Sequence, residues 1–374
     1  MNMRIAHVVR QYHPSVGGME DVVRNIARHQ LESGFRPVVV TLDRLFRDRE
    51  QVLPAQDEVD RVPVRRLSYA GSSRYPLCPQ VLRLLGDADV IHVHGVDFFF
   101  DYLAATRWLH HRPLVASTHG GFFHTHFAAS LKKVFFHTVT RSSARGYDRI
   151  IATSDSDGRI FAPIVGNGRL QVIENGVNVG KFRACSASDP VPTLIYFGRW
   201  SENKGLPAAL DLLARLRRTD PAWRLIVAGR EYDYSAAALR ALIAARNLAA
   251  AVEVVPNPAD AELAALIGRA SYFICLSRHE GFGLAALEAM SAGLVPVLSD
   301  IPPFRSLVER SQVGVVVESG REDDAVASLN REHRLPRERQ CRRRERAIAF
   351  AEPYDWRHVA GCYLRVYREV ERAT

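Results

Sequence analysis

The chain has 374 residues, of which 47% are hydrophobic and 24% charged, a composition that excludes disordered, collagen-like and coiled-coil proteins. Its length predicts two domains. Five cysteines without a C-x-x-C pair argue against a disulfide framework or a cysteine zinc site, and favour a cytoplasmic protein with reduced thiols. The short apolar run at the start is too brief for a signal peptide, and no stretch reaches the roughly 18 to 20 apolar residues of a membrane span. We therefore expect a protein that is neither exported nor integral to a membrane.

Positive charge is the second global feature. The net charge of +9 indicates an anionic partner such as nucleic acid, a membrane surface or a phosphorylated ligand. Residues 331–346 hold eight arginines against three glutamates, and we interpret them as a solvated helix face, leaving open whether lipid touches it. Residues 122–145 mix phenylalanines with cations, which is typical of a helix lying on anionic lipid; an ordinary core-facing helix is the alternative. The expected membrane contacts are Phe122, Phe123, Phe127, Lys132, Lys133, Phe136 and Arg141.

Secondary structure is predicted to alternate between strands and helices along the whole chain. In the first half, strands are expected at residues 4–9, 36–41, 62–67, 89–94, 113–118, 148–153 and 169–174, with helices at 19–34, 97–111 and 127–145. A proline-containing stretch at 185–192 is typical of a linker. In the second half, strands are expected at 193–198, 224–229, 252–256, 271–277, 295–300 and 313–317, with helices at 204–218, 235–247, 259–268 and from about 284. This α/β pattern predicts two Rossmann-like domains with doubly wound parallel sheets, residues 1–184 and 190–356.

Ligands of such sheets bind beyond the carboxyl ends of the strands, so two domains predict an interdomain cleft lined by these loops. In the first domain, Gly17 and Gly18 begin a helix, where backbone amides can approach a phosphate or a sugar closely. The pair does not form G-x-G-x-x-G, which disfavours a dinucleotide cofactor, and a plain turn is the alternative reading. His119 follows a predicted strand, and its side chain is expected to point into the cleft.

Histidines are concentrated between positions 92 and 137, so a metal site has to be weighed. The pairs His92/His94 and His124/His126 lack a carboxylate at ligand spacing. His92 is expected to be a strand residue satisfied by hydrogen bonds. Two D-x-D strings, at 87–89 and 155–157, fall before a strand and at the start of a helix, positions typical of a turn and a cap. We therefore predict no metal and no cofactor.

In the second domain, Arg199 and Lys204 precede a helix and can clamp a diphosphate. Only 4 of the 50 basic residues are lysines, which suggests that the compact ammonium of Lys204 is needed, although surface charge is the alternative. Glu280 and Glu288 lie eight residues apart, roughly 12 Å along a helix. That is too far for the carboxylate pair of a retaining glycosidase, so the two glutamates are expected to have separate roles. The amides of Phe282, Gly283 and Leu284 suit a phosphate and a sugar hydroxyl, and Glu288 can reach a ribose.

These motifs together resemble the retaining glycosyltransferases of family 4, which have the GT-B architecture. The E-x7-E string from Glu280 to Glu288 is the specific motif, and GGME at 17–20, STHG at 117–120 and GRWSENKG at 198–205 stand in the expected order. The resemblance covers essentially the whole chain. It implies that a last helix, residues 357–374, crosses back onto the first domain.

The resemblance also implies roles for individual residues. Arg199 and Lys204 would bind the donor diphosphate, Glu288 the ribose and Glu280 the transferred sugar. Gly17 and Gly18 would close against the donor, and His119 would lie beside the reacting centre. Ser154 is a further candidate for the cleft. Catalysis is accordingly assigned to His119, Glu280, Arg199 and Lys204.

The opening string HVVRQYHPSVGGMEDVVRNIA resembles, more narrowly, those family members that transfer mannose from GDP-mannose to a polyprenyl-diphosphate-linked oligosaccharide in exopolysaccharide biosynthesis. This implies a peripheral enzyme on the inner face of the cell membrane. A UDP-sugar donor, glucose or N-acetylglucosamine, with another acceptor is the alternative. A basic nucleic-acid-binding protein and a catalytically inactive binding module are the remaining readings; the first would bind DNA with a steep dependence on salt.

Overall fold

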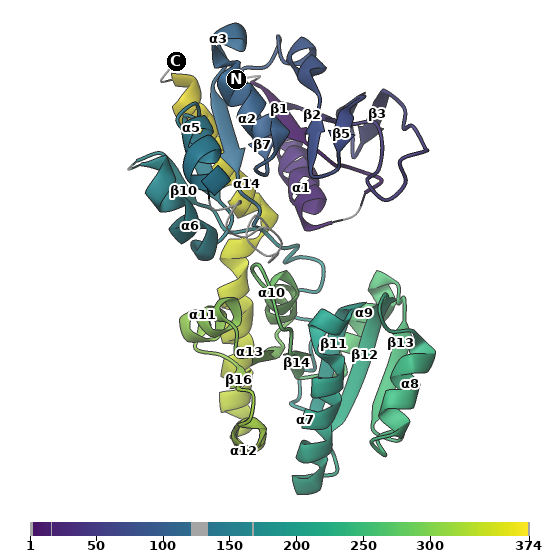
Figure 1. The fold of residues 1–374 in the computed structure, drawn as a ribbon. Coiled ribbons are helices and arrows are strands. Elements are labelled where there is room, and N and C mark those ends of the chain that lie inside the picture. The colour runs from purple at the N-terminus through teal and green to yellow at the C-terminus, as the bar shows by residue number, and fades with distance from the viewer. Residues whose placement is uncertain (1–2, 16, 121–133, 167, 373–374) are drawn as a thin grey trace. The chain divides into compact units, whose positions relative to one another are not determined.

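The computed structural model describes residues 3–15, 17–120, 134–166 and 168–372. Five residues of the predicted membrane contact therefore lie outside the described residues: Phe122, Phe123, Phe127, Lys132 and Lys133. The chain divides into two compact units, one of Met1–Gly176 with Trp356–Thr374 and one of Val177–Asp355 (Figure 1).

The first unit is built on an eight-stranded sheet with the order β10-β9-β8-β7-β1-β2-β4-β3. Only β3 runs antiparallel to its neighbour, a pairing that the sequence pattern did not predict. The strands are β1 (Arg4–Val9), β2 (Arg36–Leu42), β3 (Gln56–Val59), β4 (Val62–Leu67), β7 (Val90–His94), β8 (Leu114–Ser117), β9 (Arg149–Ala152) and β10 (Leu170–Val172); a separate hairpin, also not predicted, joins β5 (Ala70–Ser72) to β6 (Tyr75–Leu77). The central strands are apolar throughout because both of their faces are buried.

Helices cover both faces of this sheet. They are α1 (Gly18–Glu32), η1 (Pro79–Leu84), α2 (Phe98–Ala105), α3 (Arg107–His110), η2 (Phe136–Thr140), α5 (Arg141–Ala144), α6 (Asp155–Val165) and α14 (Trp356–Arg372). The last of these, α14, packs beside α1 and buries Tyr363 and Tyr367 against the sheet. A Cβ on Gly176 would lie 2.6 Å from the Trp356 ring, so glycine is needed where the chain passes this helix. The prediction that the last helix returns to the first domain is confirmed.

The second unit contains a six-stranded parallel sheet with the order β13-β12-β11-β14-β15-β16. Its strands are β11 (Thr193–Trp200), β12 (Arg224–Glu231), β13 (Val252–Pro256), β14 (Tyr272–Cys275), β15 (Val295–Ser299) and β16 (Val315–Val317). Its helices are η3 (Glu202–Lys204), α7 (Leu206–Thr219), α8 (Ala236–Ala244), α9 (Asp260–Ile267), α10 (Leu284–Ser291), α11 (Pro302–Ser311), α12 (Glu322–His333), α13 (Arg337–Ala351) and η4 (Glu352–Tyr354). The alternation of strand and helix agrees with the predicted pattern.

The boundary between the units lies earlier than the sequence suggested. Residues 177–184 group with the second unit, and the predicted linker is fastened to α13. Arg337 contacts Asp189, and Arg344 binds the hydroxyl of Ser186 and the carbonyl of Ala184. The arginine-rich run thus has a partly structural role, although six of its eight arginines are exposed as predicted.

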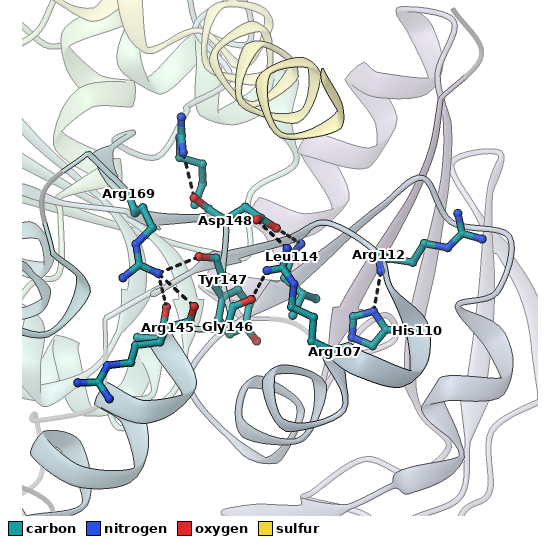
Figure 2. A network of polar contacts seen from close by, with 11 residues as sticks. Arg107, His110, Arg112, Leu114, Arg145, Gly146, Tyr147, Asp148 and Arg169 are labelled. Carbon is teal, nitrogen blue, oxygen red and sulfur yellow. Dashed lines mark hydrogen bonds and ion pairs between the residues drawn. The ribbon is translucent and has the colours of Figure 1, made fainter. Parts of the chain in front are cut away.

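Arginines also hold the chain between α5 and β9 in the first unit (Figure 2). Arg169 Nη1 donates to the carbonyls of residues 144, 145 and 147 at 3.2 to 3.3 Å, and its Nη2 donates to the carbonyl of Val165 at 2.6 Å. Arg107 donates to the carbonyl of Gly146 and to Asp148, which itself accepts from the amide of Leu114. One planar guanidinium satisfies several carbonyls that the helix end leaves open, which a lysine cannot do.

The predicted membrane contact is wrong for Phe136. Its side chain is only 2% exposed and packs edge-on against Phe161 in the apolar core. Arg141, in contrast, is exposed, as are Val134 (60%) and Val139 (39%). Within the described part of the chain, no helix is both long enough and apolar enough to cross a bilayer.

Candidate functional site

The predicted donor-binding residues of the second unit lie near the end of β11 and beyond the ends of β11 and β14. These are neighbouring parallel strands from which the strand order proceeds in opposite directions. Loops that leave such a switch point diverge and form the usual ligand crevice of an open α/β sheet. Here the two loops are joined by Asn203. Its side chain donates to the carbonyl of His279 at 2.8 Å and accepts from the amide of the same residue at 3.1 Å. The loops therefore form one unit around the candidate residues.

Lys204 and Glu280 meet within this loop pair. The Nζ of Lys204 lies 2.6 Å from Oε1 of Glu280, and the hydroxyl of Ser277 donates to the same oxygen at 2.7 Å. The two side chains are only 19% and 16% exposed. Such a partly buried pair is held more firmly than a surface ion pair, because solvent competes less for it. The sequence predicted both residues but not their contact, nor the role of Ser277.

Two glycines shape the same loops. Gly205 has φ +67°, and a Cβ there would lie 2.1 Å from the carbonyl oxygen of Leu276. Gly283 has φ +92° at the N-cap of α10, and a Cβ there would lie 2.8 Å from the Phe304 ring. Glycine is required at both positions because side chains there would meet backbone or a packed aromatic ring. The amides of Phe282, Gly283 and Leu284 consequently lie at the start of α10, and Glu288 is half-buried further along this helix.

Arg199 is exposed near the end of β11, with its guanidinium 5.3 Å from the centre of the Tyr232 ring. The Tyr196 hydroxyl donates to the carbonyl of Arg199 at 2.6 Å. The cation is thus supported by an aromatic face and is not neutralised by a carboxylate in any contact that the structure describes for it. The sequence indicated the loop at 230–234 as a candidate for reading the donor base but did not name Tyr232 as a site residue; its position after β12 was the available signal.

In the first unit, Gly17 and Gly18 begin α1 directly after the β1 loop. A Cβ on Gly17 would lie 2.5 Å from Oε2 of Glu20, whereas a Cβ on Gly18 would meet nothing within 4 Å. Glu20 in turn accepts a hydrogen bond from the Ser15 hydroxyl at 2.9 Å. The described contacts therefore do not require glycine at position 18.

His119 follows β8 with φ +54°, a left-handed conformation that costs a non-glycine residue about 1 kcal/mol. Asp157 holds the segment in place from both sides, because its carboxylate accepts from the Thr118 hydroxyl at 2.6 Å and from the Gly120 amide at 2.9 Å. Strain that the surroundings maintain in this way is typical of functional sites. Ser154 caps α6, since its hydroxyl accepts from the Asp157 amide at 3.1 Å.

Three further buried histidines lie behind His119. His7 and His92 are paired in the register of β1 and β7, and His94 is on the same face two residues after His92. The Nδ1 atom of His94 lies 2.8 Å from Nε2 of His119, and the Nε2 atom of His94 lies 2.9 Å from Nδ1 of His7. Burial lowers the pKa of His119 to about 3 and that of His7 to about 4, and it lowers the pKa of His92 and of His94 well below the usual value for histidine. These side chains are neutral at physiological pH.

The ligand atoms of His7, His92 and His94 lie within 4.8 Å of one another, which is close enough to hold a metal ion. Each ring nitrogen of the three is, however, already engaged in a hydrogen bond. His92 contacts Tyr367 and Ser117, at 2.7 and 2.8 Å, as expected for a satisfied strand histidine. His7 contacts Gln30 at 2.7 Å in addition to His94. The group therefore fits a hydrogen-bonded network better than a cation site.

Comparison with known proteins gives a consistent result. Residues 16–181 match the family described as "Glycosyltransferase Family 4", and residues 181–349 match "Glycosyl transferases group 1". The chain is 50% identical, over 98% of its length and 97% of the relative, to the GDP-mannose:cellobiosyl-diphosphopolyprenol alpha-mannosyltransferase of Xanthomonas oryzae. A protein of the same name from Komagataeibacter xylinus is 44% identical, over 98% and 93%. Among solved structures, HepE of Anabaena in complex with UDP and glucose superimposes with a TM-score of 0.72 at 20% identity, over 98% of this chain and 100% of that one, which supports the predicted GT-B fold.

Proposed function

Because this chain belongs to the family 4 glycosyltransferases, we propose that it transfers a mannosyl residue from GDP-mannose to a polyprenyl-diphosphate-linked oligosaccharide in exopolysaccharide biosynthesis. The observation that carries the proposal is the 50% identity over 98% of the chain to the Xanthomonas oryzae enzyme, whose name states both substrates. The similarity covers 98% of the chain and therefore extends over both units.

The proposed reaction retains the anomeric configuration. The bond between C1 of mannose and the β-phosphate oxygen of GDP breaks, and a bond from C1 to an acceptor hydroxyl oxygen forms on the same face of the sugar. The proton of that hydroxyl passes to the departing phosphate oxygen. The protein's main contribution is to stabilise the negative charge that develops on the diphosphate.

Arg199, Lys204 and the start of α10 supply this stabilisation. The cations would contact the diphosphate, and the amides of Phe282, Gly283 and Leu284 would add the partial positive charge of the helix N-terminus. Glu280 would bind the transferred mannose, and Glu288 the ribose. The observed ion pair between Lys204 and Glu280 supports these roles, because it places the proposed sugar ligand beside the proposed diphosphate ligand.

In the first unit, we assign the backbone of Gly17 and Gly18 to the donor, and His119 to a position beside the reacting sugar. The open space at Gly18 and the maintained strain at His119 support these assignments. Ser154 acts in this scheme through the start of α6, where it orients Asp157 and hence the His119 segment.

We further propose that transfer needs no divalent metal, because protein cations take its place at the diphosphate. Aspartates of the two D-x-D strings form other contacts. Asp87 pairs with Arg4 at 3.0 Å, Asp89 accepts from the Arg4 amide at 2.7 Å, and Asp157 holds the His119 segment. Activity that persists unchanged in excess EDTA would support this, and activity restored only by added Mg²⁺ or Mn²⁺ would contradict it.

A lipid-linked acceptor requires access to a membrane, and we propose peripheral attachment at the inner face through the region around Arg141. Exposed Val134 and Val139 lie in the same segment and replace Phe136 as apolar contacts. Apolar side chains next to a cation suit an anionic lipid surface. Substituting Arg141→Glu should reduce sedimentation with vesicles containing anionic lipid, while vesicles of neutral lipid serve as the control.

Donor choice is tested by calorimetric titration in EDTA with GDP-mannose, UDP-glucose and UDP-N-acetylglucosamine. We expect GDP-mannose alone to bind, and Lys204→Ala to weaken its binding about tenfold or more, which corresponds to about 1.4 kcal/mol. Lys181→Ala is the matched control, because Lys181 also forms an ion pair in the second unit, at 2.8 Å with Asp260, but takes no part in the candidate site.

Preference for a UDP-sugar would replace the donor assignment while keeping the family. Equal loss of binding in both lysine variants would show that Lys204 acts only through general charge. Binding of DNA with a steep salt dependence but no binding of nucleotide sugars would overturn the proposal itself.

A further inference from the structure

A continuous chain of hydrogen bonds runs through the first unit and ends at His119. It begins at Gln30 of α1, whose Oε1 lies 2.7 Å from Nε2 of His7. It continues from His7 to His94 at 2.9 Å and from His94 to His119 at 2.8 Å. The first three members are buried and come from three elements, α1, β1 and β7.

The chemistry of neutral imidazole gives this chain a direction. A neutral ring carries one N–H and one lone pair, so each histidine must donate on one side and accept on the other. The amide oxygen of Gln30 can only accept, so His7 donates from Nε2 and must accept at Nδ1 from His94. His94 in turn accepts at its own Nδ1 from Nε2–H of His119. The remaining nitrogen of His119, Nδ1, therefore carries a lone pair.

The Gln30 amide also contacts the C-terminal helix. Its Nε2 donates to the Tyr367 hydroxyl at 3.3 Å, and its Oε1 faces His7. The Tyr367 hydroxyl lies 2.7 Å from Nδ1 of His92, and Nε2 of His92 lies 2.8 Å from the Ser117 hydroxyl. With Tyr367 donating to His92, every bond of both branches has one donor and one acceptor.

The free end of this series of hydrogen bonds is Nδ1 of His119, the residue assigned above to the reacting sugar. Among the described residues, none forms a hydrogen bond with Nδ1 of His119. The His119 backbone is held in a left-handed conformation between two residues that Asp157 binds. The backbone of His119 is thus held by Asp157 of α6, and its ring is held by the hydrogen bond to buried His94.

We propose that Gln30, His7 and His94 are positioning residues that hold His119 in its Nε2–H tautomer, so that Nδ1 is presented as a hydrogen-bond acceptor to a hydroxyl of the reacting sugar. This inference rests on the proposed function for the role of His119 and extends it to three buried residues. The other tautomer would present an N–H at this position, although the sugar hydroxyl needs an acceptor for its own proton. Loss of this positioned hydrogen bond would slow catalysis.

The direct test is the ¹⁵N NMR spectrum of the histidine rings in the full chain, with the His119 signals assigned by their loss in His119→Asn. We expect a protonated Nε2 and an unprotonated Nδ1 at His119 in the wild type. A protonated Nδ1 would overturn the proposal without reference to any variant or to the identity of the donor.

Gln30→Glu should reverse the donor–acceptor direction of the hydrogen bonds from residue 30 to His119. If the new carboxyl is protonated it donates to Nε2 of His7, and if it ionises it makes His7 a cation; a lone carboxylate beside a neutral ring is disfavoured at this depth. In either favoured case His7 donates from Nδ1, the protonated nitrogen of His94 changes from Nε2 to Nδ1, and His119 becomes protonated at Nδ1. We expect this tautomer change with a fall in kcat of about tenfold or more, as for one transition-state hydrogen bond, and a GDP-mannose Kd changed less than twofold.

Ser117→Ala is the matched control, because Ser117 is equally buried and its hydroxyl contacts His92 but, among the described contacts, none of Gln30, His7, His94 and His119. It should leave both the His119 tautomer and kcat unchanged. A fall in kcat in Gln30→Glu without a tautomer change would overturn the positioning role and leave a merely structural one. Failure of the wild type to bind GDP-mannose would contradict the proposed function instead, and the tautomer measurement would still stand.

Discussion

Two residues in this protein have features that their immediate packing does not explain. Lys204 is one of four lysines in a chain that otherwise uses arginine, and it forms a partly buried pair with Glu280. Gly18 is another example, because the described fold leaves open space where a side chain would be. Residues that the fold does not require are the best places to separate binding from stability.

Gly18→Ala provides such a separation. The new methyl group should raise helix stability, by up to about 1 kcal/mol, since alanine is favoured over glycine in a helix. If the donor approaches this backbone, the same methyl group should weaken GDP-mannose binding about tenfold or more. Thermal unfolding and calorimetric titration measure the two effects.

Gly361→Ala is the control for this substitution. It lies in α14 of the same unit, and a Cβ there would also meet nothing within 4 Å. It should raise stability without changing donor binding. Unchanged binding in both variants would remove Gly18 from the donor site.

At the scale of elements, the ends of helices determine where the site residues lie. Ser154 begins α6, and Asp157 in the first turn of that helix holds the His119 segment. At the opposite end of the β9 strand, Arg107 and Arg169 satisfy the carbonyls between α5 and β9 (Figure 2). The first arrangement thus holds the segment of a candidate site residue, whereas the second orders the loop between α5 and β9.

Ser154→Ala should lower the free energy of unfolding by about 1 kcal/mol through loss of the helix cap. We expect kcat to fall as well, because Asp157 loses one of its supports, while the Kd of GDP-mannose stays the same. Chemical denaturation and steady-state kinetics with a lipid-linked acceptor are the measurements. A variant that loses donor binding instead would place the Ser154 hydroxyl on the donor.

Arg169→Lys should lower the free energy of unfolding by about 1 to 3 kcal/mol, because an ammonium cannot replace the hydrogen bonds that the guanidinium donates to four carbonyls. Donor binding should not change. Arg145→Lys is the control, since the Arg145 side chain is exposed and the substitution removes none of these four bonds. Equal stability of the two variants, measured by urea denaturation, would refute a special role for the guanidinium of Arg169.

At the scale of the whole molecule, the C-terminal helix completes the first unit and connects the end of the chain to the buried histidines through Tyr367. Four histidines held neutral by burial make the folded first unit sensitive to acid. An unfolded histidine takes up a proton near pH 6.5, whereas His7 in the folded chain does so only near pH 4. Stability is therefore complete above about pH 6.5 and is lost as the pH falls toward 4, by up to about 1.4 kcal/mol per pH unit for each histidine.

Native-state hydrogen exchange of the β1 and β7 amides measures this loss for the first unit alone. We expect protection to decrease steadily from pH 6.5 to pH 4.5 after correction for the intrinsic exchange rate. His7→Gln should reduce the slope of the opening free energy against pH by the contribution of about one proton. His13→Gln, at an exposed position, should not change this slope. A flat profile would mean that the histidines are not held neutral by the fold.

The sequence by itself determined the alternation of strands and helices and the two-unit organisation, and its resemblance to family 4 implied the return of the last helix. The alternation is encoded in local periodicity, and the resemblance in motifs such as the Glu280 to Glu288 string, which need no partner to be recognised. The tertiary structure decided what depends on residues far apart in the chain. It buried Phe136, moved the unit boundary to residue 176, paired Lys204 with Glu280 across 76 positions and joined Gln30, His94 and Tyr367 to one network. Such contacts depend on strand register and on which helix covers which face, and neither is set by a local pattern.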